Sequence, residues 1–138
     1  MIALDTNIIV RVVTRDDATQ HAAAVEVMRS PQLFVSRTVL LETAWVLTHT
    51  YALERAIVGR ALSALVGYPN MTIEDRGSVL RALAWHSQGM DIADAFHLSS
   101  PRDVTHFATF DKKLAAAAAR LPDAPTVRVV GSQERVAD

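Results

Sequence analysis

Short apolar runs alternate with helix-favouring segments along the whole chain, and this alternation constrains the fold more than any other feature. The strand candidates are IAL, LFV, MTI, VTHFATF and TVRVV. Strands separated by helices form parallel sheets, because a parallel connection must cross over the sheet and usually does so as a helix. We therefore predict an α/β fold with three layers, α/β/α, around a mostly parallel sheet of about five strands.

Capping residues and apolar spacing locate several helices within this frame. Asp5 or Thr6 can cap the first helix, Ser36 the helix that runs to Tyr51, and Asp75 a later helix. In the segment 53–65 the apolar residues follow helical spacing, which predicts a buried face. The residues of that predicted face are Leu53, Ala56, Ile57, Ala61, Ala64 and Leu65.

Composition limits the class of protein. A chain of 138 residues with 50% apolar content suits a single domain, residues 1–138. The net charge of −1 argues against a protein that coats DNA through many basic contacts, although a local basic rim remains compatible with it. There is no cysteine, which excludes disulfides, thiolate metal sites and cysteine nucleophiles. We expect a cytoplasmic protein without a signal peptide or a membrane span.

Acidic side chains recur where predicted strands end. Asp5 directly follows the first strand, Asp111 directly follows HFATF, and Glu42 lies one turn into the otherwise apolar helix after the second strand. Ligands of open parallel sheets bind beyond the carboxyl ends of the strands, so these three carboxylates are expected at one edge.

Asp91 and Asp94 add two more carboxylates, three residues apart on one predicted helical face. Crowded carboxylates raise one another's pKa unless a cation neutralises them. With oxygen ligands and no thiolate, Mg²⁺ or Mn²⁺ is the expected ion. Such ions serve the hydrolysis of phosphodiester bonds.

Each acid also has a simpler interpretation. Asp5, Asp91 and Asp111 all stand where an N-cap is expected, and Glu42 would be an ordinary residue on an exposed face. Asp94 is harder to explain, because it lies inside a helix among apolar neighbours.

Four segments, IALDTNIIV, LLETAWVL, GMDIADAFHL and FATFDKKL, together resemble the motif set of PIN-domain ribonucleases, in the family's order. The resemblance covers essentially the whole chain and is greatest to VapC-like toxins of bacterial toxin–antitoxin modules. It implies the PIN fold, Mg²⁺- or Mn²⁺-dependent endoribonuclease activity and inhibition by a cognate antitoxin. Pro101 departs from the subgroup's pattern by ending the DIADAFHL helix early, which affects the expected rim and leaves the acidic motifs intact.

The resemblance also implies roles for individual residues. The catalytic and metal-binding positions carry over onto Asp5, Glu42, Asp94 and Asp111, with Asp91 at the edge of the metal site. Thr6 and Asn7 match the polar pair after the first aspartate, and Thr109 matches a hydroxyl that orients water.

Other polar residues allow two interpretations each. His97 can reach the site from Asp94's helix, although a core or capping role is the more common one for such a histidine. Lys112 and Lys113 can contact RNA phosphates or simply begin a solvated helix. Arg11 and Arg15 can form a basic rim or be merely exposed.

The sequence also predicts binding partners and allows two alternative functions. The helix 37–51 is more apolar than one core face requires, which predicts a homodimer and a neighbouring groove for an antitoxin segment. One rival is a phosphatase with Asp5 as nucleophile, although such enzymes commonly need a second aspartate where Asn7 stands. Another rival is a domain that binds RNA or protein without catalysis.

Overall fold

The computed structural model describes residues 1–131, in which five strands and seven helices alternate. The strands are β1 (Ile2–Ala3), β2 (Leu33–Val35), β3 (Met71–Ile73), β4 (Phe107–Thr109) and β5 (Val127–Val129). The helices are α1 (Thr6–Thr14), α2 (Ala18–Met28), α3 (Arg37–His49), α4 (Arg55–Val66), α5 (Arg76–Ser87), α6 (Ile92–Ser99) and α7 (Lys112–Ala119). All strand pairs are parallel, which confirms the predicted α/β class.

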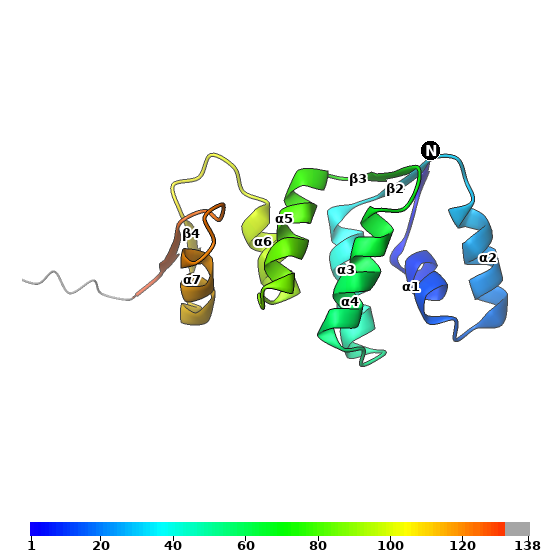
Figure 1. The fold of residues 1–138 in the computed structure, drawn as a ribbon, viewed down its shortest axis with the longest axis horizontal. Helices are drawn as coiled ribbons and strands as arrows, with labels where there is room; N and C mark the ends of the chain where they lie inside the picture. The colour runs from blue at the N-terminus through cyan, green and yellow to red at the C-terminus, as the bar shows by residue number, and fades with distance from the viewer. Residues whose placement is uncertain (132–138) are drawn as a thin grey trace, which may run out of the picture.

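The five strands are divided between two sheets. One sheet has the order β1-β2-β3, with Ile2 opposite Leu33 and Leu33 opposite Met71. The other contains β4 and β5, with Phe107 opposite Val127. Figure 1 shows β4 and α7 at one end of the elongated molecule and β1, α1 and α2 at the other. The expected strands are therefore present, but β4 does not join the sheet that contains β1.

The main core lies between the first sheet and the helices that follow it. Its fully buried members share large aliphatic side chains and come from β2, α3, α4, α5 and α6. They include Leu33, Val35, Leu40, Leu47, Leu62, Val79 and Leu98. Because α6 contributes to this core, the second half of the chain is anchored to the first.

Two arginines strengthen that anchorage. Arg37 of α3 donates to the Phe96 carbonyl at 2.5 Å and to the Ser78 hydroxyl, and its guanidinium lies 5.1 Å from the centroid of the Phe96 ring. Arg55 donates to the carbonyls of His86 and Met90. Charge-assisted hydrogen bonds of this kind are stronger than neutral ones. They fix α5 and α6 against α3 and α4.

The helix caps largely follow the sequence. The side chains of Asp5, Ser36, Asp91 and Asp111 each accept a hydrogen bond from a backbone N–H at the start of a helix. Asp75 precedes α5 but makes no such bond. Its backbone has a φ of 47°, and its carboxylate pairs instead with Arg102 at 2.8 Å.

The predicted buried face of the segment 53–65 is wrong, because the face that is buried is rotated around the helix axis relative to it. The buried residues of α4 are Val58, Leu62, Leu65 and Val66, whereas Ile57 is 39% exposed. Both sets have helical spacing. The observed face buries larger side chains than the alanine-rich predicted face, and hydrophobic stabilisation grows with the apolar area buried.

Among the helices described in residues 1–131, none combines the length and the hydropathy that a bilayer-spanning segment needs.

Candidate active site

Asp5 stands at the carboxyl end of β1, where the chain turns into α1. Its carboxylate accepts a hydrogen bond from the Thr6 N–H at 2.8 Å, so it caps the helix while remaining exposed. Thr6 is buried and Asn7 is exposed. A cap uses one lone pair of a carboxylate that has several. Asp5 can therefore cap α1 and still bind a cation or a substrate.

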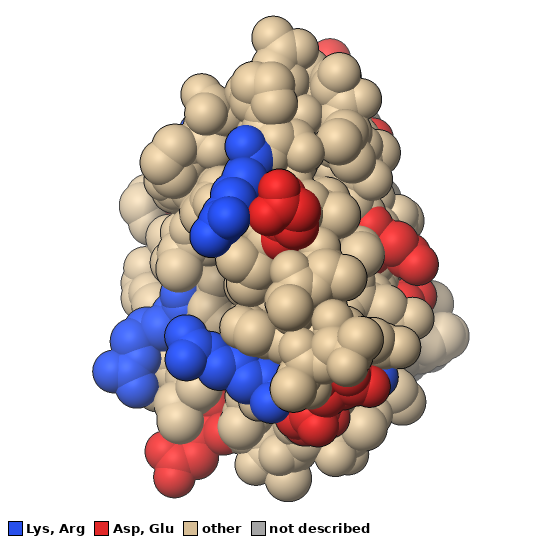
Figure 2. Space-filling view, turned by 90° about the vertical axis from the view of Figure 1, so that its right-hand side faces the viewer, with Lys and Arg blue, Asp and Glu red and all other residues tan. Residues whose placement is uncertain are grey.

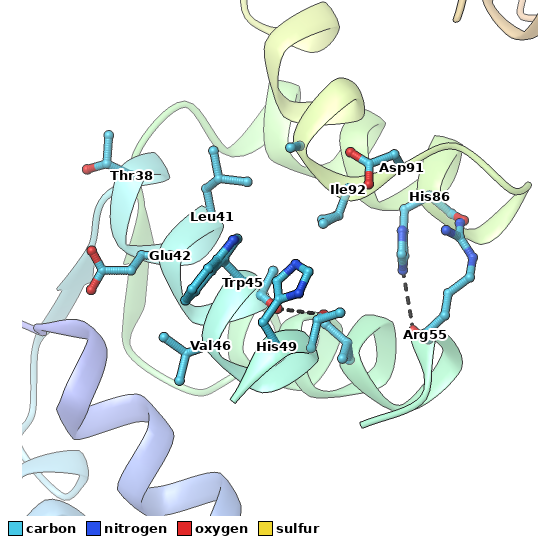
Figure 3. Close-up of a pocket in the computed structure, with 14 residues that line it drawn as sticks. Thr38, Leu41, Glu42, Trp45, Val46, His49, Arg55, His86, Asp91 and Ile92 are labelled. Carbon is cyan, nitrogen blue, oxygen red and sulfur yellow. Dashed lines mark hydrogen bonds between the residues drawn. The ribbon is translucent and has the colours of Figure 1, made fainter. Parts of the chain in front are cut away.

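Glu42 lies on α3, the helix that packs against α1, and its side chain is exposed. It borders a hollow of about 810 Å³ between α3, α4 and α6. In Figure 3, Glu42 and Asp91 are on opposite sides of this hollow, and Glu42 points away from it toward the side on which α1 lies. The Glu42 side chain is thus directed toward the side of α1 and away from α6.

Asp94, in the first turn of α6, lies close enough to Asp91 and Asp111 for their charges to act on it. The Asp91 carboxylate accepts from the Asp94 N–H at 3.0 Å. Partial burial raises the pKa of the Asp94 carboxyl, the charges of Asp91 and Asp111 raise it further, and His97 opposes this shift. Asp94 is therefore held near two like charges, which is the electrostatic environment that a bound cation relieves.

Asp111 is fixed by its own capping bonds. Its carboxylate accepts from the N–H groups of Lys113 at 2.9 Å and Leu114 at 3.1 Å. The Thr109 hydroxyl accepts from the Asp111 N–H at 3.0 Å, so Thr109 shapes the turn that presents the carboxylate. A role of Thr109 in orienting water stays a prediction.

The acids thus fall into two sets according to the part of the chain that carries them. We call Asp5 and Glu42 the N-terminal acidic pair, and Asp91, Asp94 and Asp111 the C-terminal acidic group. Within residues 1–131, no three Asp, Glu, His or Cys side chains are arranged to hold a metal ion. One copy of the chain, in this conformation, does not bring its predicted ligands together. We therefore assign no metal geometry to it.

The charged surroundings are mixed in sign. Arg11 is not free, because it binds Asp16 at 2.8 Å and also Gln20 and Tyr51. The end of the molecule formed by α1 and α2 carries basic and acidic side chains close together (Figure 2). Lys112 and Lys113 are exposed at the start of α7, beside Asp111. They are the only two lysines in the chain.

Comparison with known proteins identifies the family. The PIN-domain family matches residues 2–120, which is most of the chain. The chain belongs to the PIN-domain family. Among solved structures, it is similar to the Mycobacterium tuberculosis toxin VapC20, described as cleaving the sarcin–ricin loop, with 22% identity and a TM-score of 0.41. That similarity covers 85% of this chain and 95% of the other. No curated protein sequence matches this one.

In this PIN domain, the acids of all four motifs lie within the matched region. The β1 motif supplies Asp5, the α3 motif Glu42, the α6 motif Asp91 and Asp94, and the β4 motif Asp111. His97 is exposed, so the interpretation as a core histidine is wrong. It lies beside a second hollow of about 600 Å³, together with Arg37 and Phe107.

Sequence reasoning missed two arginines that organise this PIN domain. Arg37 and Arg55 bind backbone carbonyls of α5, α6 and the turn between them. Carbonyl acceptors leave no trace in the sequence, because every residue has one. The buried His86, whose ring faces the carbonyls of Met90 and Arg55, is hidden for the same reason.

Proposed function

We propose that this PIN domain is a metal-dependent endoribonuclease, the toxin of a toxin–antitoxin module, acting on RNA in the cytoplasm. The observation that carries the proposal is the family match over residues 2–120, which includes an acid in each of the four motifs. The raised pKa of Asp94 beside Asp91 and Asp111 supports a cation at this group. A bound Mg²⁺ or Mn²⁺ would supply the positive charge that phosphodiester hydrolysis requires.

The acidic residues have separate tasks in this proposal. Asp94 and Asp111 are the principal cation ligands of the C-terminal acidic group, and Asp91 lies at its edge. Asp5 and Glu42 complete the ligand set. Lys112 and Lys113, at the exposed start of α7 next to Asp111, contact RNA phosphates.

The surface of α3 supports a protein partner. Trp45 is 58% exposed and, with Leu41, Val46 and Ile92, lines the hollow of about 810 Å³. A large aromatic side chain beside an apolar hollow is typical of an anchoring point for another polypeptide. We propose that the antitoxin binds at this hollow, and that it binds to a homodimer of this chain.

The nuclease proposal is tested with purified protein, a labelled single-stranded RNA and Mg²⁺ or Mn²⁺. We expect cleavage products that end in 5′-phosphate and 3′-hydroxyl, complete inhibition by EDTA, and recovery on adding excess Mn²⁺. Asp94→Asn should lower the rate by at least about 100-fold, in the range that removal of a key catalytic group produces.

The matched control is Glu26→Gln, which removes an exposed acid of α2 that pairs with Arg29. It should cleave RNA as the wild type does. Cleavage that persists in EDTA would rule out the metal, and undiminished cleavage by Asp94→Asn would rule out our residue assignment. RNA that shifts in a gel but stays intact would indicate the non-catalytic alternative. Hydrolysis of a small phosphate ester alone would indicate the phosphatase.

A further inference from the structure

Two strands of this structure have an unpaired edge in the region where the acidic residues lie. In residues 1–131, β1 pairs only with β2, and β4 pairs only with β5. Both residues of β1 are exposed, and Ile2 is 45% exposed. Phe110, directly after β4, is 81% exposed. Unpaired edges next to exposed apolar side chains favour pairing with another strand.

The two edges match in direction and in spacing. β1 ends at Ala3 and Asp5 follows two residues later, while β4 ends at Thr109 and Asp111 follows two residues later. If Ala3 pairs with Thr109 in a parallel ladder, Asp5 lies beside Asp111. Neighbouring strands are about 4.8 Å apart, so this register joins the N-terminal acidic pair to the C-terminal acidic group.

The other acids at a strand end already have partners. After β3, the Glu74 carboxylate accepts from the Arg37 N–H at 3.0 Å, and Asp75 pairs with Arg102 at 2.8 Å. Among the described residues, Asp5 and Asp111 have only their capping bonds to backbone N–H groups. Pairing β1 with β4 would therefore bring together the carboxylates of Asp5 and Asp111. Both still have oxygen lone pairs that these capping bonds do not occupy.

The chain's own β4 is held away from its own β1. Trp85 of α5 donates to Asp123 at 3.1 Å, and Phe107 of β4 shares the hollow of about 600 Å³ with Phe96. Arg37 and Arg55 in turn fix α5 and α6 to α3 and α4. Figure 1 shows the consequence, with β4 and β1 toward opposite ends of the molecule. Closure within one chain would move the β4–β5 sheet relative to α5, and the Trp85–Asp123 hydrogen bond opposes this movement.

We propose that β1 is paired with β4 of a second copy of this chain. Two elongated copies lying antiparallel form the contact twice, with β1 of each beside β4 of the other, so the interface closes with two-fold symmetry. Each acidic site then contains Asp5 and Glu42 of one copy and Asp91, Asp94 and Asp111 of its partner. The catalytic meaning of this composite site rests on the proposed function, whereas the assembly itself does not.

The test uses the absence of native cysteine. Ile2 and Ala108 face each other in the proposed register, and both are exposed. Strand neighbours lie within the range of about 4.4–6.8 Å between Cα atoms that a disulfide spans. We expect the Ile2→Cys/Ala108→Cys protein, mildly oxidised, to run on non-reducing gels at twice the monomer mass. Peptide mass spectrometry should then identify a disulfide that joins position 2 of one chain to position 108 of the other.

The matched control is Ile2→Cys/Ala116→Cys, which keeps the first substitution and moves the second to an exposed position of α7. It should give no more cross-linking than Ile2→Cys alone. A disulfide between positions 2 and 108 of the same chain would overturn the proposal in favour of closure of the chain on itself. Failure of the first pair to exceed the control would also overturn it.

A second measurement needs no variant. Light scattering of the wild-type protein should give the dimer mass at micromolar concentration, and a monomer mass there would overturn the proposal. Neither readout depends on RNA cleavage. A protein that is dimeric and cross-linked but does not cleave RNA would therefore contradict the proposed function and leave the strand exchange supported.

Discussion

Asp94 illustrates how one residue can oppose folding and still be proposed as a cation ligand. Its pKa is raised above the ordinary value of 3.8 by partial burial and by the charges of Asp91 and Asp111. A carboxyl whose pKa is raised in the folded state contributes stability below its unfolded pKa, and this contribution is lost as the pH rises through the folded pKa. At neutral pH, ionised Asp94 therefore lowers the free energy of unfolding.

Replacing Asp94 by Asn should relieve this cost. We expect Asp94→Asn to unfold at higher denaturant concentration than the wild type at pH 7, and the difference to shrink as the pH falls through the raised folded pKa and to be lost below the ordinary value of 3.8. The measurement is urea unfolding followed by circular dichroism, at one fixed protein concentration because a dimer's apparent stability depends on it. The control, Glu26→Gln, should show no such pH-dependent gain. A variant less stable than the wild type at pH 7 would contradict the electrostatic account.

The acids show what sequence could establish at this scale. The capping interpretations of Asp5, Asp91 and Asp111 are correct, because each carboxylate binds backbone N–H groups at a helix start. Capping and function do not exclude each other, since a cap occupies only part of a carboxylate. Local rules therefore identified the bonds that these side chains make. They could not identify the distances between acids on different elements.

At the scale of elements, α4 shows why a helix was easier to locate than to orient. Its range follows from apolar spacing and from Gly67 and Pro69 after it. Its buried face does not, because two overlapping sets of residues both have helical spacing. The structure buries Val58 and Leu62, both 1% exposed, and leaves Ile57 39% exposed. The choice depends on what packs against the helix, and the segment itself does not contain that information.

This difference can be measured on a single helix. Leu62→Ala should lower the free energy of unfolding by about 2–5 kcal/mol, because it removes a fully buried side chain and leaves a cavity. Ile57→Ala removes a half-exposed side chain of similar size and should cost less than about 1 kcal/mol. Both values come from denaturant unfolding at one protein concentration. Equal losses of unfolding free energy for the two variants, or a larger loss for Ile57→Ala, would support the buried face that the sequence pattern predicted.

At the scale of the whole molecule, the sequence predicted the order of the elements but not how the strands are shared between sheets. Runs such as LFV and MTI carry their strand preference locally. The arrangement of the second half of the chain involves Arg37, Arg55 and the Trp85–Asp123 hydrogen bond, which join residues far apart in the chain. Long-range interactions of this kind leave no local sequence pattern, so neither the divided sheet nor the divided site could be predicted from the sequence.

A divided site that is completed by a second copy makes a prediction about mixed dimers. Asp5→Asn and Asp111→Asn should each be inactive alone. In a heterodimer of the two, one site contains both substitutions and the other contains none. Co-expression with different tags and tandem purification would isolate this heterodimer. We expect it to cleave RNA at about half the wild-type rate, because one of the two symmetry-related sites is intact.

The control heterodimer combines Asp5→Asn with Glu42→Gln, both from the N-terminal acidic pair. Each of its sites then carries one substitution, so it should stay inactive, although its folding and purification match those of the first heterodimer. If the acids instead converged within one chain, every site of both heterodimers would contain a substitution and neither would be active. Activity of the Asp5→Asn/Asp111→Asn heterodimer, together with inactivity of the Asp5→Asn/Glu42→Gln heterodimer, would show that each site is shared between two copies. Inactivity of both heterodimers, with wild-type protein purified in the same way still cleaving the RNA, would show that each copy assembles its own site.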